Sequence, residues 1–216
     1  GVTQHWRYAH DSQMLMAALA TATKRVRVVT TVHTLLQNPA VTAKMIATLD
    51  HISNGRAGLN IVTGAYKGEF EQMQAWRENV GHDARYDLAD EWIGIIKRLW
   101  TEDSVTFEGK YFTMTDCESD PKPLSPPFLV CAGTSTRGQR FTADHADAIF
   151  VTGKDDAEIA RIGTDMKAMA AEAGRAIKTY TMLTLVIGET DQAAEAEADW
   201  YRAGFDWEAC KGMMRA

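Results

Sequence analysis

The chain has 216 residues, of which 45% are hydrophobic and 24% are charged, a balance typical of a soluble globular protein. Its formal net charge is -6 and its basic residues are interspersed with acidic ones, so neither a nucleic-acid partner nor an anionic-membrane partner is expected. The sequence shows no apolar run of the ~18 residues that a bilayer-spanning helix needs, and no signal peptide at its start.

Segments with helical spacing and short apolar or β-branched runs alternate along the chain. They predict, in chain order, a helix over 9–25, a strand over 26–32, a helix over 37–56, a strand over 58–64, a helix over 85–100, a hairpin over 104–116, a strand over 128–133, a helix over 134–146, a strand over 147–153, a helix over 155–175, a strand over 179–190 and a last helix from Asp191. The second of these helices has the clearest boundary signals, with Asn38 as N-cap, Pro39 at the first helical position and Gly55 as terminator.

The alternation of strands with helices indicates right-handed crossovers and a parallel sheet. A doubly wound sheet and a (β/α)8 barrel both fit this order. No G-x-G-x-x-G and no G-x-x-x-x-G-K-[ST] follows a strand, which favours the barrel. Only five strands are predicted, whereas a closed barrel has eight strands in roughly 250 residues. We therefore expect residues 1–216 to be a single, truncated barrel domain, with a hairpin and proline-rich insertion over 101–127.

Polar residues collect at the carboxyl ends of the predicted strands, where a barrel has its active site. Thr31 lies at the end of the first strand, His33 follows it, and Asn60 lies in the second. A buried amide without a partner costs about 1–3 kcal/mol, so Asn60 either faces a ligand or is satisfied by neighbouring strands. His33 could serve as an acid or base, or could be a satisfied structural histidine.

Two further groups of residues could bind a ligand. The small-residue turn 132–138 leads into a helix, whose N–H groups could cradle a phosphate together with the Ser135 hydroxyl, although Ser135 could equally be a simple helix cap. Glu69, Arg85 and Tyr86 flank the loop after the second strand. An acid, a guanidinium and a phenol could together hold a sugar-phosphate chain, or they could lie on a solvated helix start.

Several common catalytic patterns are absent from the sequence. It contains no G-x-S-x-G and no H-E-x-x-H, and its six histidines lack metal-ligand spacing, so no metal is expected. Its three cysteines, Cys117, Cys131 and Cys210, are odd in number and far apart. This fits reduced thiols in the cytoplasm better than a disulfide framework or a zinc site.

Four long stretches resemble one known family. Residues 51–76, 84–100, 107–117 and 130–138 are similar to the bacterial-luciferase-like flavin monooxygenases, and within them to the pyrimidine (uracil/thymine) monooxygenase group. The resemblance runs over nearly the full length of the chain. It implies a (β/α)8 TIM barrel that binds FMN at its C-terminal face, with this chain covering the third to seventh strands. Two strands would precede Gly1 and one would follow Ala216.

The resemblance also implies roles for individual residues. Asn60 matches an asparagine that contacts the flavin ring, and Thr31 pairs with it in family members thought to place O2 beside the flavin. Ser135 matches a phosphate-binding serine. The FMN contacts that it implies are Asn60, Glu69, Arg85, Tyr86 and Ser135, and the residues that it implies for catalysis are Thr31 and Asn60.

The function implied by the resemblance is that of a two-component monooxygenase. A separate flavin reductase would supply reduced FMN, which would be used with O2 to oxygenate a small, pyrimidine-like substrate, and the protein would be a homo-oligomer. His33 and Gln37 stand where the pyrimidine group has small or apolar residues, which leaves the substrate open. The alternatives are a deazaflavin-dependent oxidoreductase of the same fold and a catalytically incompetent flavin-binding fragment.

Overall fold

The structure, a computed structural model, describes residues 9–64 and 67–215. These divide into two compact units, one formed by His10–Thr181 and the other containing the chain from Met182 onwards. Each unit is described by itself.

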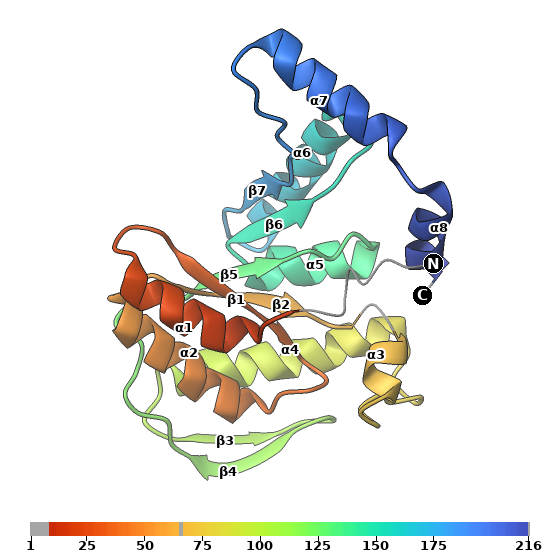
Figure 1. Cartoon of the computed structure of the whole chain (residues 1–216). Helices are drawn as coiled ribbons and strands as arrows, with labels where there is room; N and C mark the ends of the chain where they lie inside the picture. Colours follow the sequence, from red (N-terminus) through yellow and green to blue (C-terminus); the bar gives the residue numbers. More distant parts are fainter. Residues whose placement is uncertain (1–8, 65–66, 216) are drawn as a thin grey trace. The chain divides into compact units, whose positions relative to one another are not determined.

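The larger unit contains one sheet, one hairpin and the helices that cover them (Figure 1). Its elements are α1 (Ser12–Ala22), β1 (Val28–His33), α2 (Pro39–Ser53), β2 (Ala57–Val62), α3 (Lys67–Glu71), α4 (His82–Leu99), β3 (Val105–Glu108), β4 (Thr113–Cys117), β5 (Phe128–Cys131), α5 (Thr136–His145), β6 (Ala148–Val151), α6 (Asp156–Glu172) and β7 (Lys178–Thr181). The sheet has the order β1-β2-β5-β6-β7, and all its neighbouring strands are parallel. The predicted parallel sheet and the predicted antiparallel hairpin are both confirmed.

The two faces of the sheet differ in burial. Side chains at alternate positions, such as Val32, Leu59 and Ile149, are buried beneath the helices. Helices α1, α2 and α4 pack at the β1–β2 end, and α5 and α6 at the β5–β7 end (Figure 1). On the other face, Phe150 and Tyr180 keep 38% of their surface exposed. This open face is the one that carries Thr31 and Asn60, which are register partners in β1 and β2.

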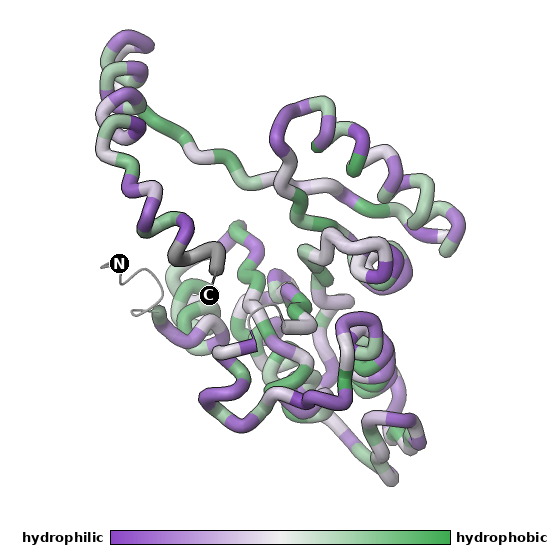
Figure 2. The backbone as a smooth tube through the Cα atoms, turned by 90° about the vertical axis from the view of Figure 1, so that its right-hand side faces the viewer, coloured by the Kyte–Doolittle hydropathy of each residue, from purple (hydrophilic) through white to green (hydrophobic). Residues whose placement is uncertain are grey.

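Helix α4 supplies the centre of the core. Its apolar residues form one stripe at helical spacing, in which Trp92, Ile93, Ile96 and Leu99 are fully buried. The Trp92 indole N–H donates to the Gln37 carbonyl at 2.8 Å, so the ring is buried with its polar atom satisfied. Burial of each such side chain stabilises the fold by about 1.5–3 kcal/mol. Along the tube of Figure 2, purple and green alternate within the helices, as expected for helices with one buried face.

Most element boundaries differ from the prediction by a few residues. Helix α4 begins at His82 and not at Arg85, so Arg85 and Tyr86 lie at the end of its first turn. Helix α2 ends at Ser53, and its C-cap is Asn54, which is left-handed with φ 55° and lies one residue before Gly55. Strand β7 stops at Thr181, whereas a strand was predicted to Thr190. Its partner β6 has only four residues, so Met182 and the residues after it have no ladder to join, and they are exposed.

The second unit contains α7 (Asp191–Ala203) and α8 (Trp207–Arg215). The start of α7 at Asp191 is as predicted, with the Thr190 side chain accepting from the Ala193 N–H. Helices α3 and α8 were not predicted. A single barrel domain over 1–216 with an insertion over 101–127 stays a prediction. Within the described residues, every helix is too short or too polar to cross a membrane.

Candidate functional site

A cavity of about 370 Å³ lies at the carboxyl ends of β2 and β5. Its walls come from these two strand ends, the loops after them, and the first turns of α4 and α5. The residues that line it are Ile61, Val62, Thr63, Gly64, His82, Arg85, Tyr86, Cys131, Ala132, Gly133, Thr134, Ser135 and Phe141. Three of the six predicted site residues, Arg85, Tyr86 and Ser135, therefore share one cavity. We refer to it as the strand-end cavity.

Thr31 and Asn60 form a pair on the open face of the sheet, next to this cavity. They are register partners, and the Asn60 Nδ2 donates to the Thr31 Oγ1 at 3.2 Å. The Asn60 Oδ1 is buried and has no hydrogen-bond partner among the described residues. Such an atom costs about 1–3 kcal/mol unless a ligand or water satisfies it. Within the described residues, the neighbouring strand thus provides a hydrogen-bond partner for the Asn60 Nδ2 but none for its Oδ1.

Arg85 and Tyr86 project from α4. The Arg85 guanidinium lies 5.0 Å from the centre of the Trp76 ring, and its buried Nε has no partner among residues 9–64 and 67–215. Tyr86 is 8% exposed, and its ring packs on Phe141 of α5 with centroids 5.7 Å apart. Arg85 therefore brings an incompletely satisfied cation, and Tyr86 a fixed aromatic wall.

Two glycines give the Tyr86 hydroxyl its space. A Cβ on Gly138 would lie 2.5 Å from the Tyr86 Oη, and a Cβ on Gly133 would lie 2.8 Å from the same atom. The two glycines also approach each other closely, since a Cβ on Gly138 would be 3.0 Å from the Gly133 Cα. Only glycine at both positions allows the phenol to reach the loop that precedes α5.

Ser135 is the N-cap of α5. Its Oγ accepts from the Gly138 N–H at 3.1 Å, which confirms the capping interpretation. The hydroxyl proton is not used by this bond, and the N–H groups of the first turn carry the positive end of the helix dipole. Capping and anion binding are therefore compatible at this residue.

Arg137 of α5 links this helix to α4 through ion pairs with two aspartates. Its Nη2 bonds to Asp90 and, at 3.0 Å, to Asp87, and its guanidinium lies 5.7 Å from the centre of the Tyr86 ring. Burial works to raise the pKa of Asp90, but hydrogen bonds from His145 and Arg137 outweigh it and lower the pKa. Asp90 is thus held as a carboxylate, and the two helices are held together beside Tyr86.

Glu69 lies in α3, the helix that follows β2, and His33 is the last residue of β1. Glu69 is exposed on α3, and its charge acts on His33. The His33 ring makes an edge contact with Phe70 at a centroid distance of 5.4 Å, and its buried Nδ1 lacks a partner within the described chain. Unlike Arg85 and Tyr86, Glu69 does not line the strand-end cavity.

His33 should make stability depend on pH. Burial lowers its pKa from the ordinary value of 6.5, and the Glu69 carboxylate offsets this only in part. The unfolded chain then takes up a proton at His33 at a higher pH than the folded chain, so stability falls as the pH drops below about 6.5. We expect the His33→Asn variant to lose less unfolding free energy than the wild type between about pH 7.5 and pH 5.5. Urea unfolding at several pH values measures this, with exposed His10→Asn as control. Equal pH slopes for wild type and His33→Asn would contradict it.

The structure also bears on thiolate chemistry and on metal binding. Burial raises the pKa of the Cys131 thiol to about 12, so this cavity-lining cysteine is not a thiolate near neutral pH. Within residues 9–64 and 67–215, no three or more histidine, cysteine or carboxylate side chains are grouped so that they could hold a metal ion. Gly133 and Gly138 were missed as site residues, although their G-x-x-x-x-G spacing, which runs from the turn into the helix, was visible in the sequence.

Comparison with known proteins supplies an independent view. Residues 1–215 match the family model described as luciferase-like monooxygenase. Pyrimidine monooxygenase RutA of Cronobacter sakazakii is 41% identical over 212 residues, which is 97% of this chain and 62% of that protein. The chain spans 54–62% of the length of the curated relatives of this name that it matches.

Solved structures agree with the family match. Riboflavin lyase RcaE, solved with modified FMN and riboflavin, superposes with a TM-score of 0.81 at 29% identity, over 89% of this chain and 48% of that one. Long-chain alkane monooxygenase LadA gives a TM-score of 0.84 at 27% identity, over 92% of this chain and 51% of that one.

Proposed function

Because the chain belongs to the luciferase-like monooxygenase family, we propose that it forms the cofactor-binding part of an FMN-dependent monooxygenase that oxygenates a small, pyrimidine-like substrate. The name of the RutA relatives supports the reaction and the substrate class. The modified FMN named with the riboflavin lyase structure supports the cofactor.

One observation carries the proposal. The strand-end cavity combines a serine-capped helix N-terminus, a buried guanidinium atom without a partner and, beside it, a buried amide oxygen without a partner. A phosphate suits the first two groups, because both attract negative charge. A ring that carries N–H groups suits the third, because the Asn60 Oδ1 is an acceptor. FMN has both parts in one molecule, so the residues present fit this cofactor.

The roles of the residues follow from their chemistry. The Ser135 hydroxyl and the first-turn N–H groups of α5 would bind the phosphate, and Arg85 would add positive charge. Tyr86 would form a wall of the phosphate site, and Glu69 would accept hydrogen bonds from the hydroxyl chain. Thr31 and Asn60 would hydrogen-bond the ring and orient O2 beside it. When bound, reduced FMN supplies the electrons for the reaction with O2.

The partners of the whole enzyme follow from the same proposal. A separate flavin reductase would deliver reduced FMN, and the open face of the sheet at Thr31 would be closed to water during the reaction. The enzyme would be a homo-oligomer.

A matched pair of glycine substitutions tests the cofactor site. Gly138 and Gly94 both lie in helices, but a Cβ on Gly94 would meet no heavy atom within 4 Å, whereas one on Gly138 would displace the Tyr86 hydroxyl. We expect Gly138→Ala to weaken FMN binding at least about tenfold. Gly94→Ala should leave binding unchanged and stabilise α4 by about 1 kcal/mol.

Fluorescence titration of both variants with FMN provides the measurement, with thermal unfolding as a check on folding. Equal FMN affinities for Gly138→Ala and Gly94→Ala would show that the cofactor does not use this cavity.

A further inference from the structure

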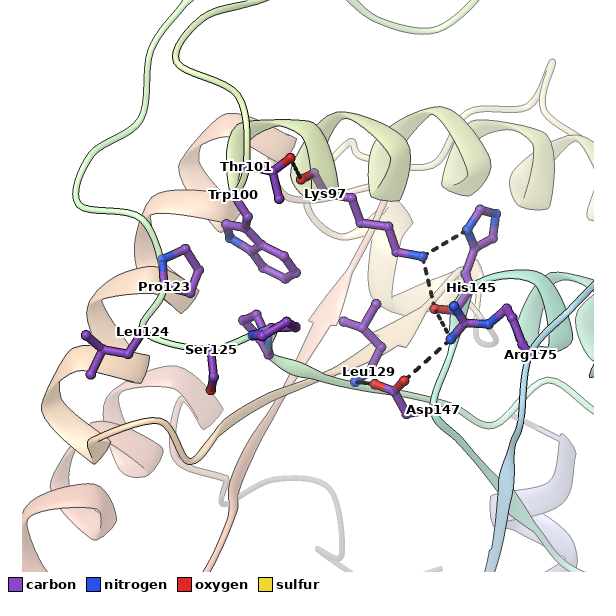
Figure 3. A pocket seen from close by; sticks show the side chains of 12 residues that line it. Lys97, Trp100, Thr101, Pro123, Leu124, Ser125, Leu129, His145, Asp147 and Arg175 are labelled. Atoms are coloured by element: carbon purple, nitrogen blue, oxygen red, sulfur yellow. Dashed lines mark hydrogen bonds and ion pairs between the residues drawn. The ribbon is translucent and has the colours of Figure 1, made fainter.

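A second cavity, of about 460 Å³, lies at the opposite edge of the sheet, where the strands begin. Leu129 is the second residue of β5, Asp147 directly precedes β6, and Arg175 lies between α6 and β7. The side wall is formed by the last turn of α4 and the proline-rich connector. Figure 3 shows the side chains converging on this space, which we call the strand-start cavity.

One end of the strand-start cavity is positively charged. Lys97 and Arg175 meet there, and Asp147 is the carboxylate beside them (Figure 3). The Asp147 Oδ2 accepts from the Leu129 N–H at 2.8 Å, and its Oδ1 accepts a long bond from the Arg175 Nη2 at 3.4 Å. The cations Lys97 and Arg175 thus share one carboxylate, Asp147, which already accepts a backbone N–H. One positive charge is therefore left without a partner among the described residues.

The hydrogen bonds of Lys97 show where that unpaired charge lies. The His145 Nε2 lies 2.9 Å from the Asp90 Oδ1, so it carries the proton and leaves Nδ1 as an acceptor. The Lys97 Nζ contacts this Nδ1 at 3.4 Å and the His145 carbonyl at 3.1 Å. An ammonium has three donors, so one remains. No carboxylate of the described chain pairs with it, and burial, followed by the charge of Arg175, lowers its pKa.

The other end of the cavity is apolar. The Trp100 ring, Pro123, Pro126 and Leu129 form its walls, and its volume lies within the range of about 300–1,000 Å³ usual for small-molecule sites. Trp100 is held in place, since its indole N–H donates to the Ala43 carbonyl at 3.1 Å. Flat, rigid side chains of this kind suit a planar ring.

We infer that the strand-start cavity binds a small organic monoanion, a carboxylate carried on a flat apolar ring. The carboxylate would accept the free Lys97 N–H and balance the excess charge of the Lys97–Arg175–Asp147 group. The ring would lie between Trp100 and the proline walls. This site is at the opposite end of the strands from the strand-end cavity, and it does not depend on the proposed function.

The test uses 4-fluorobenzoate as probe and 4-fluorobenzyl alcohol as its uncharged counterpart, observed by ¹⁹F NMR of the ligand. We expect saturable binding of the benzoate with a Kd of about 1 mM, and binding of the alcohol at least about tenfold weaker. Lys97→Met should weaken benzoate binding at least about tenfold, whereas the same change at exposed Lys167 should have no effect.

Two further variants keep the test decisive. Thr101→Glu places a carboxylate one helical turn after Lys97, at a lining position that is exposed, and should displace the benzoate even if Lys97→Met does not fold. Ser135→Ala, in the strand-end cavity, should leave benzoate binding unchanged. The inference is overturned if benzoate shows no saturation up to about 20 mM, if the alcohol binds equally well, if neither Lys97→Met nor Thr101→Glu weakens binding, or if Ser135→Ala abolishes it.

Discussion

In the full-length enzyme that we propose, replacing Asn60 with alanine is expected to lower turnover of a pyrimidine substrate with reduced FMN and O2 about 100-fold, while FMN affinity changes by less than about threefold. The Asn60 Nδ2 donates a hydrogen bond to the Thr31 Oγ1 at 3.2 Å. Because the buried Asn60 Oδ1 has no hydrogen-bond partner among the described residues, it is available to form a hydrogen bond during the reaction. The FMN phosphate, by contrast, would be bound by Ser135 and α5, which the substitution does not touch.

Steady-state turnover with a reductase present, together with an FMN titration, measures both quantities. Asn79→Ala, at an exposed turn, serves as the control and should match the wild type in both. Equal losses of turnover and FMN affinity in Asn60→Ala would mean that Asn60 only binds the cofactor and does not orient oxygen.

The second large effect concerns stability. Asp50 is fully buried at the end of α2, and its carboxylate accepts from the Ala57 N–H at 3.2 Å, the Leu124 N–H at 2.8 Å and the Ser125 N–H at 3.2 Å. It therefore joins the start of β2 to the proline-rich connector. We expect Asp50→Ala to lower the free energy of unfolding by about 3 kcal/mol or more, because three backbone donors lose their acceptor.

Urea unfolding monitored by circular dichroism gives this value. Asp165→Ala, which removes an exposed carboxylate paired with Arg161 on α6, should change stability by less than about 0.5 kcal/mol. A loss below about 1 kcal/mol in Asp50→Ala would show that water replaces the carboxylate in binding these N–H groups.

Local signals predicted the elements well where a few neighbouring residues decide the structure. Asn38 caps α2 by accepting from the Ala40 N–H, and Asp155 caps α6 by accepting from the Glu158 N–H. The apolar stripe of α4 and the parallel order of the five strands also follow from periodicity. The extent of β7 could not be predicted, because it is limited by the length of its partner β6.

Contacts between distant residues account for what sequence reasoning missed. Asp50 bonds to residues 74 and 75 positions away, and nothing near Asp50 in the sequence indicates this. The role of Gly138 becomes clear only when Tyr86 of α4 is seen against it. The strand-start cavity likewise joins Lys97 to Arg175, which are separated by four strands and two helices along the chain.

The most direct test of the proposed function is a fluorescence titration of the chain with FMN and, in parallel, with the deazaflavin cofactor. Our account predicts saturable binding of FMN at one site and weaker binding of the deazaflavin. A preference for the deazaflavin cofactor, or no saturable binding of FMN, would contradict the assignment of the strand-end cavity to FMN.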